Sequence, residues 1–137
     1  MRVIGIDPGG KRLGLAVGDT TSGLATPLGV IPYGGRADAA SSIAATMTEN
    51  ESEIAIIGLP TNVDGEETPA CRRSHAMAEA LAELGLDVVL QPEYLSTDEA
   101  RRRARAMGRR SSRPVDDLAA QVILEEYFER HGFGGRF

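Results

Sequence analysis

The sequence predicts a single α/β domain, in which five strands form a mixed sheet and helices cover both of its faces. Three strand-like segments come first, at residues 2–7, 13–18 and 24–32, and only short turns separate them. Helical and strand-like segments then alternate, which is typical of a sheet that gains its later strands through helical crossovers. The length of 137 residues fits one domain, and we take residues 1–137 as that domain.

The first strand ends in an acid. Residues 2–7 form an apolar run typical of a buried strand, and Asp7 is its last residue. A Pro-Gly-Gly turn follows, after which residues 13–18 form the second strand. A carboxylate at this position suits a divalent cation better than it suits packing. The alternative is an aspartate that begins the turn by hydrogen-bonding to its own backbone, and this segment alone does not decide between the two.

The rest of the chain alternates between helix and strand. Ile43 and Met47 lie on the apolar face of a predicted helix over 37–50, and residues 53–58 are typical of a buried strand. The elements predicted after these are a loop over 59–67, a helix from Thr68 to about Leu84, a strand over 87–91, a helix from Ser96 to about Met107, a polar loop over 108–113, a helix from Pro114 to about Arg130 and a frayed tail over 132–137.

Three of the predicted helices have recognisable start signals. Thr68 is suited to cap a helix that has Pro69 at its first position. Ser96, with Glu99 three residues later, fits a capping box. Pro114 opens the last helix.

The composition excludes several classes of function. Cys71 is the only cysteine, so neither a disulfide framework nor a thiolate metal cluster is expected. His75 and His131 are isolated, which leaves no attractive Ser-His-Asp or Cys-His arrangement. No apolar run approaches the roughly 20 residues that a bilayer span needs, and the first residues lack a signal-peptide pattern. We therefore expect a cytoplasmic protein without membrane contact.

Acidic side chains occur where elements of this frame begin or end. Asp7 ends the first strand, Glu93 follows the fifth, and Asp116 and Asp117 lie in the first turn of the last helix. We expect the ends of the first and fifth strands to adjoin, with the helix start packed at the same point. Clustered carboxylates repel one another unless a cation binds, and oxygen ligands suit Mg²⁺ or Mn²⁺. Two ions about 4 Å apart would activate water and stabilise the leaving oxygen of a phosphodiester.

Each acid also has a structural explanation. Asp116 and Asp117 are favourable at the positive end of a helix dipole, and Glu93 serves equally well as a solvated loop residue. Only the joint placement of the acids favours the metal site.

Positive charge is concentrated in this chain, although the net charge is −5. Seven arginines occupy residues 101–113, and Lys11 and Arg12 lie close to Asp7 in the sequence. This density favours phosphate binding, and the alternative is a solvated helix face. The predicted phosphate-binding residues of these two segments are Lys11, Arg12, Arg109, Arg110 and Arg113.

Two loops are further candidates for contact with nucleic acid. Residues 58–65 follow a buried strand and precede a helix, where α/β sheets place ligand-contacting groups. Asn62 and Asp64 in this loop either hydrogen-bond a nucleic-acid backbone or shape an Asn-x-Asp-Gly turn, and the chemistry favours neither. The loop over 108–113 lies just ahead of Asp116 and is either a flap that closes over phosphate or a passive connector.

Five motifs along nearly the whole chain follow the order and spacing of a known family. They are Ile6-Asp7-Pro8-Gly9 with Lys11-Arg12-Leu13-Gly14, Ala25-Thr26-Pro27-Leu28, Gly58-Leu59-Pro60-Thr61-Asn62-Val63-Asp64-Gly65, Glu93-Tyr94-Leu95-Ser96-Thr97 with Glu99-Ala100, and Val115-Asp116 with Ala119-Ala120 and Ile123-Leu124. With these motifs the chain resembles the YqgF (RuvX) family, whose members are described as Holliday junction resolvases or pre-16S rRNA nucleases.

The resemblance implies a ribonuclease-H-like (RuvC-like) fold and Mg²⁺ or Mn²⁺ as cofactor. It places the family's catalytic acids on Asp7, Glu93 and Asp116, with Asp117 as an additional candidate metal ligand. The chain departs from the family at Tyr94, because the family commonly has Asp-Glu-Arg where this chain has Pro-Glu-Tyr. A cation that would hold a phosphate is missing there, so we expect a weaker grip on the substrate.

Three hypotheses of function follow. The first is a divalent-metal-dependent endonuclease acting on structured RNA or branched DNA, which the resemblance specifies as processing of the 5′ end of pre-16S rRNA in ribosome biogenesis, or as Holliday junction resolution in DNA recombination and repair. The second is a non-catalytic nucleic-acid-binding or ribosome-assembly factor. The third is a nucleotide-binding module, because residues 3–14 also resemble a phosphate loop of the actin and sugar-kinase fold, which needs a far longer chain. The sequence favours the first hypothesis. It does not decide whether the protein is a monomer or a weak homodimer.

Overall fold

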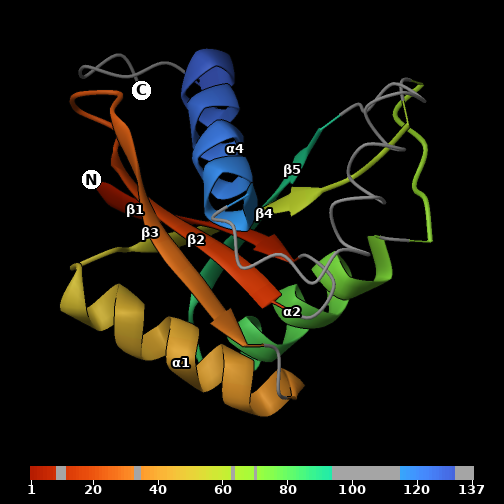
Figure 1. The fold of residues 1–137 in the computed structure, drawn as a ribbon, viewed down its shortest axis with the longest axis horizontal. Coiled ribbons are helices and arrows are strands. Elements are labelled where there is room, and N and C mark those ends of the chain that lie inside the picture. The colour runs from red at the N-terminus through yellow and green to blue at the C-terminus, as the bar shows by residue number, and fades with distance from the viewer. Residues whose placement is uncertain (9–11, 33–34, 63, 70, 94–114, 132–137) are drawn as a thin grey trace.

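The computed structural model describes residues 1–8, 12–32, 35–62, 64–69, 71–93 and 115–131, with residues 115–118 described by their backbone alone. Its helices and strands follow one another along the chain as Figure 1 shows. They are β1 (Arg2–Pro8), β2 (Arg12–Asp19), β3 (Ala25–Pro32), α1 (Arg36–Glu49), β4 (Ile54–Leu59), α2 (Cys71–Glu83), β5 (Asp87–Pro92) and α4 (Val115–His131).

The strands of the described residues form one mixed sheet in the order β3-β2-β1-β4-β5. β1 pairs antiparallel with β2, and β2 pairs antiparallel with β3, which confirms the predicted three-stranded meander. β4 runs parallel to both of its neighbours, β1 and β5. The carboxyl ends of β1, β4 and β5 therefore meet at one edge of the sheet, which we call the carboxyl edge; the opposite edge is the amino edge.

Helices cover both faces of the sheet, as predicted (Figure 1). On one face, Ile43 of α1 and Met77 of α2 are completely buried against strand residues such as Ile57. On the other face, α4 buries Phe128 in a second apolar cluster that includes Val3 of β1. We call this second side of the sheet the α4 face.

α4 approaches the sheet closely because glycines lie beneath it. A Cβ atom on Gly5 of β1 would lie 2.6 Å from Cγ of Leu124, and one on Gly18 of β2 would lie 2.8 Å from the ring of Phe128. Gly18 is paired with Val3, nearer to the amino edge than Gly5 is. α4 therefore runs antiparallel to β1, and its first turn lies towards the carboxyl edge.

The observed strand bounds agree with the predicted ones to within one residue, but the predicted start of the second helix was wrong. α2 begins at Cys71 rather than at Pro69. The hydroxyl of Thr68 does not cap it, because it donates to the carbonyl oxygen of Pro60 at 2.8 Å. The backbone N–H groups of Cys71 and Arg72 donate to the carbonyls of Thr68 and Pro69, so a tight turn precedes the helix.

Several predictions concern segments that lie outside the described residues. They are the helix over 96–107, the loop over 108–113, Tyr94 and the tail over 132–137. In the part of the chain that is described, no helix is both long enough and apolar enough to cross a membrane.

Candidate active site at the carboxyl edge of the sheet

Asp7 and Glu93 both lie at the carboxyl edge. Asp7 is the penultimate residue of β1, and Glu93 directly follows β5. The backbone N–H of Glu93 donates to the carbonyl oxygen of Leu59 at 3.0 Å, so the pairing of β4 and β5 continues as far as this acid. Each side chain is only 8% exposed. Regular strand backbone thus positions both carboxylates rigidly.

Strand alternation places both acids on the α4 face. Successive strand residues point to opposite faces of a sheet. Val3 belongs to the cluster beneath α4, so Asp7, four residues later in the same strand, lies on that face too. Val89 packs against the same cluster, and Glu93 again lies four residues further on.

A glycine separates the two acids. β4 lies between β1 and β5, so the expectation that the ends of the first and fifth strands adjoin was wrong. Two strand spacings amount to about 10 Å. Gly58 of β4 lies between them, and a Cβ atom on Gly58 would lie 2.7 Å from Oε2 of Glu93. The Glu93 carboxylate therefore leans over β4 in the direction of β1, through space that any other residue at position 58 would fill.

The backbone of Asp116 lies level with these acids. Ala120 sits over Gly5, since a Cβ atom on Gly5 would lie 2.9 Å from the carbonyl oxygen of Ala120. Asp116 is four helical residues before Ala120, about 6 Å along the axis. Asp7 is two strand residues beyond Gly5, about 6.6 Å in the same direction. The side chains of Asp116 and Asp117 lie outside the described residues, and the side chains that are described include no group of three acids, histidines or cysteines able to hold a metal.

The loop between β4 and α2 is organised by Asn62. Its Oδ1 accepts hydrogen bonds from the backbone N–H groups of Asp64, at 3.0 Å, and Glu66, at 2.9 Å. Its Nδ2 donates to Oε1 of Glu66 at 3.1 Å. The hydroxyl of Ser74 in α2 donates to the carbonyl oxygen of Gly58 at 2.6 Å and ties the helix to the end of β4. Asn62 thus shapes the loop, and the side chain of Asp64 is exposed.

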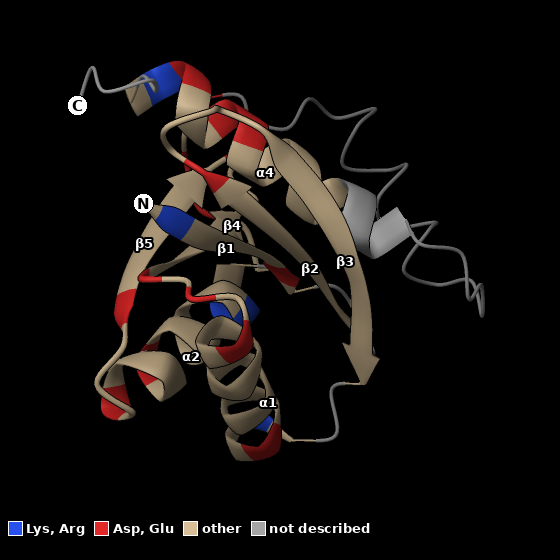
Figure 2. Cartoon of the chain, turned by 90° about the vertical axis from the view of Figure 1, so that its left-hand side faces the viewer, with Lys and Arg blue, Asp and Glu red and all other residues tan. Residues whose placement is uncertain are grey.

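Of the predicted phosphate-binding residues, Arg12 lies at this edge, and two further arginines lie near it. Arg12 is the first residue of β2, and its neighbour Leu13 is paired with Pro8, so it lies near Asp7. Exposed Arg72 and Arg73 lie in the first turn of α2, beside the tie from Ser74 to Gly58. In Figure 2, acidic positions gather instead along the C-terminal half of α4. Four predicted phosphate-binding residues lie outside the described residues: Lys11, Arg109, Arg110 and Arg113.

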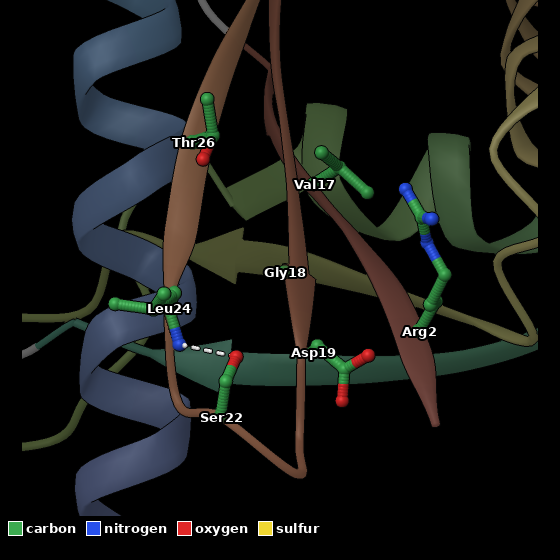
Figure 3. Close-up of a pocket in the computed structure, with 7 residues that line it drawn as sticks. All are labelled: Arg2, Val17, Gly18, Asp19, Ser22, Leu24 and Thr26. Atoms are coloured by element: carbon green, nitrogen blue, oxygen red, sulfur yellow. Dashed lines mark hydrogen bonds between the residues drawn. The ribbon is translucent and has the colours of Figure 1, made fainter.

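A shallow depression of about 210 Å³ lies at the opposite, amino edge (Figure 3). It is lined in part by Arg2 and Asp19, and five strand residues, or roughly 16 Å, separate Arg2 from Asp7. The backbone N–H of Thr21 donates to Asp19 at 2.7 Å and holds the pKa of that carboxyl below its usual value. Asp19 is thus engaged in its own hairpin, and the depression belongs to no part of the site.

The fold defines the class of protein. It is similar to Thermus thermophilus RuvC in complex with a Holliday junction substrate, with a TM-score of 0.60 and 18% identity over 95% of this chain and 94% of that one. It is also similar to the fowlpox virus Holliday junction resolvase, with a TM-score of 0.52 and 14% identity over 95% and 99% of the two chains. The chain therefore has the α/β fold of RuvC, and the predicted ribonuclease-H-like fold is confirmed.

The sequence comparisons specify the family. Residues 1–130 match the model of the family described as RuvX: Holliday junction resolvase. A protein of Anaeromyxobacter sp. (strain Fw109-5) is 43% identical over 96% of this chain and 99% of its own length, and one of Nitrosospira multiformis is 36% identical over 93% and 87%. Both are named "Putative pre-16S rRNA nuclease". The chain belongs to the RuvX (YqgF) family, as its motifs predicted.

The sequence reasoning overlooked Gly58 as part of the site. Gly58 is the first residue of the motif over 58–65, and its place in that motif was the one sign in the sequence that it belongs to the site. Its significance depends on which strand lies between β1 and β5, and no local pattern specifies that.

Proposed function

We propose that this protein is a divalent-metal-dependent endonuclease that hydrolyses phosphodiester bonds in structured RNA and processes the 5′ end of pre-16S rRNA. The observation that supports this most directly is the placement of Asp7 and Glu93. Two buried carboxylates lie on one face of one sheet edge, and the missing side chain at Gly58 makes room for the Glu93 carboxylate over β4. The names of the full-length relatives favour pre-rRNA as the substrate.

The residues at this edge fit Mg²⁺ or Mn²⁺. Both ions prefer oxygen ligands, and Mg²⁺ is typically held by one or two carboxylates together with phosphate oxygens and water. Asp7, Glu93 and Asp116 would hold the metal, with Asp117 as an additional ligand. When bound, the metal would lower the pKa of a coordinated water and neutralise charge on the phosphate.

The chain itself contributes the positions of the side chains that would hold the metal and the phosphates. Strand backbone holds Asp7 and Glu93 in place, so little reorganisation accompanies catalysis. Arg12 at the same edge is placed to hold a flanking phosphate, as are Lys11, Arg109, Arg110 and Arg113 in our sequence-based prediction.

Holliday junction resolution is the second candidate function. The family description favours it. Both substrates offer the same phosphodiester chemistry, so the acids at the carboxyl edge serve either reaction. The choice between RNA and DNA rests on surface shape and contacts to the 2′-hydroxyl.

A cleavage assay with two substrates tests the proposal. The full chain is incubated with an RNA that mimics the 5′ leader of pre-16S rRNA and with a four-way DNA junction, each with Mg²⁺, Mn²⁺ or EDTA. We expect metal-dependent cleavage of the RNA, and Asp7→Asn should reduce it by orders of magnitude while the circular dichroism spectrum stays unchanged. Cleavage of the junction alone would favour the resolvase.

Two results would contradict the nuclease assignment. An Asp7→Asn variant that cuts as fast as the parent would show that the site is placed wrongly. Tight binding of either substrate without any cleavage in Mg²⁺ or Mn²⁺ would favour a non-catalytic assembly factor.

A further inference from the structure

The carbonyl group of Gly58 lies at the point where the pairing of β1 and β4 ends. The last pair is Ile6 with Ile57, one residue short of Gly58. The carbonyl of the next residue, Leu59, accepts a hydrogen bond from the N–H of Glu93 on the β5 side. Successive carbonyls of a strand point to opposite neighbours, so the carbonyl of Gly58 points towards β1.

Pro8 explains why the pairing stops there. The carbonyl of Arg2 accepts a hydrogen bond at 2.8 Å from the N–H of Glu53, the residue before β4, so the even-numbered residues of β1 face β4. Continuation of the parallel ladder would give the carbonyl of Gly58 the N–H of residue 8. Proline has no N–H to donate. The sheet therefore supplies no donor to this carbonyl, which lies level with Asp7.

Helix α2 supplies the missing donor. Ser74 is completely buried, and its hydroxyl donates to the carbonyl oxygen of Gly58 at 2.6 Å. Two residues further on, the carbonyl oxygen of Pro60 accepts from the hydroxyl of Thr68 at 2.8 Å and from the thiol of Cys71 at 3.6 Å. Side chains from the start of α2 and the turn before it thus take the place of a strand partner at the end of β4.

The hydrogen bond from Ser74 bears directly on Glu93. The carbonyl of Gly58 and the N–H of Leu59 belong to one planar peptide group, and the carbonyl of Leu59 accepts the backbone N–H of Glu93 at 3.0 Å. The carboxylate of Glu93 occupies the space that a side chain on Gly58 would fill. A tilt of the Gly58 carbonyl would consequently move both the backbone anchor of Glu93 and the surface beneath its carboxylate.

We propose that Ser74 is a positioning residue for Glu93, because its hydroxyl gives Gly58 the hydrogen bond that Pro8 cannot give. This inference rests on the proposed nuclease function, in which Glu93 would hold the metal. α2 covers the face of the sheet opposite to that of Glu93, so Ser74 acts through β4. Loss of a group that orients a metal ligand typically costs about 10- to 100-fold in metal affinity or activity.

The test is a double-mutant cycle of Ser74→Ala and Pro8→Ala. Ser74→Ala removes the hydroxyl, and Pro8→Ala restores a backbone N–H where the ladder would supply one. The control is Gln121→Met, because Nε2 of Gln121 donates to the carbonyl oxygen of Ala25 at 3.0 Å, another bond from a helix to a strand carbonyl, nearer to the amino edge.

Three quantities are measured for each full-length variant. The Kd for Mg²⁺ is obtained without nucleic acid, from the rise in melting temperature with Mg²⁺ concentration. Single-turnover cleavage is followed against Mg²⁺ concentration, on whichever substrate the parent cuts and well below the lowest melting temperature. The Kd for that substrate is measured in EDTA.

Ser74→Ala should raise the Kd for Mg²⁺ and the Mg²⁺ concentration for half-maximal cleavage about 10-fold, with the substrate Kd unchanged. In the Pro8→Ala background the same substitution should have little further effect, because the N–H of residue 8 donates to Gly58 instead. Gln121→Met should keep the Mg²⁺ dependence of the parent. Ser74→Cys retains a weaker donor and should lie between the parent and Ser74→Ala; it takes the place of Ser74→Ala if that variant does not fold.

Three outcomes overturn the inference. A Ser74→Ala variant with the Mg²⁺ dependence of the parent assigns the hydroxyl to stability alone. An equal loss from Ser74→Ala in both backgrounds shows that the donor to Gly58 does not set the metal affinity. A loss as large in Gln121→Met assigns the effect to general destabilisation. In each case the parent still cuts, so the proposed function survives; a parent that cuts neither substrate removes the proposed function and this inference with it.

Discussion

Gly14 and Gly58 leave the strands on either side of Asp7 without side chains at its level on the α4 face. At Gly58 a Cβ atom would lie 2.5 Å from Cδ1 of Ile123 and 2.7 Å from Oε2 of Glu93. The first contact is with the core beneath α4, and the second is with the candidate site. The absence of a side chain at Gly58 therefore permits both the close packing of α4 and the position of the Glu93 carboxylate.

Gly58→Ala should impair cleavage more than it impairs stability. The added methyl group pushes Glu93 from its position over β4, which should reduce the cleavage rate about 100-fold. Crowding against Ile123 should lower the free energy of unfolding by about 1–3 kcal/mol. Single-turnover rates and urea denaturation measure the two effects.

Gly18→Ala is the matched control at the other end of the sheet. Its methyl group would lie 2.8 Å from the ring of Phe128, which is similar crowding beneath the same helix. It should lose comparable stability and keep its cleavage rate. If both variants lose activity equally, the effect of Gly58→Ala comes from displacement of α4 rather than from Glu93.

At the scale of elements, the loop between β4 and α2 holds its form through side chains within the segment and the helix that follows. Asn62 binds the backbone of Asp64 and both the backbone and the side chain of Glu66. Nε2 of His75 in α2 lies 2.8 Å from Oε1 of Glu67 and holds the far end of the loop. Of the two roles that the sequence left open for Asn62, the structure thus shows the loop-shaping one.

Asn62→Asp and Asn62→Ala should separate loop shape from substrate contact. Aspartate keeps the acceptor for two backbone N–H groups, whereas alanine removes all three hydrogen bonds. At about 0.5–1.5 kcal/mol per bond, Asn62→Ala should lower the free energy of unfolding by about 1.5–4.5 kcal/mol, and Asn62→Asp by less. If Asn62→Asp weakens nucleic-acid binding as much as Asn62→Ala does while the fold is kept, the amide contacts the substrate directly.

The arginine-rich segment over 101–113 is the second element with a testable role. Each phosphate contact releases condensed counterions and contributes about −0.9 to the salt slope of binding for duplex DNA, or about −0.7 for single strands. Changing Arg109 and Arg110 together to alanine should reduce the magnitude of the slope by roughly one to two units. Arg2→Ala, at the amino edge, is the control and should leave the slope unchanged. An unaltered slope in the double variant would assign these arginines to a solvated surface.

At the scale of the whole molecule, the sheet order and the direction of α4 bring distant segments to one edge. β1 is central, β4 and β5 are added parallel to it on one side, and α4 runs back antiparallel to β1 (Figure 1). The start of α4 and the ends of β1 and β5 consequently lie at the same level. A metal bound there would link three segments, and its binding free energy would add to the stability of the whole domain.

Mg²⁺ should therefore raise the melting temperature of the parent. A ligand at 100 times its Kd stabilises the folded state by about 2.7 kcal/mol. Asp7→Asn should melt at a higher temperature than the parent without metal, because one of the repelling carboxylates is neutral, and should gain less from Mg²⁺. Asp19→Asn, at the amino edge, should respond to Mg²⁺ as the parent does. Equal responses in the parent and Asp7→Asn would place the metal elsewhere.

Local patterns in the sequence were sufficient for much of the fold. Alternating and continuous apolar runs predicted the strands to within a residue, because burial of a strand depends on its own side chains. The acids at the ends of β1 and β5 were predictable for the same reason, since a charged residue interrupts an apolar run visibly. Motif spacing was sufficient for the family, and it placed Asp116 at the start of the last helix.

Tertiary structure alone decided how these parts meet. The insertion of β4 between β1 and β5 depends on pairing between segments far apart in the chain, which no local pattern records. That insertion makes Gly58 the floor between the acids and sets Gln91 opposite Asp7. In the sequence, Gln91 is one polar residue near the end of a strand; its burial follows only from the strands and helix packed around it.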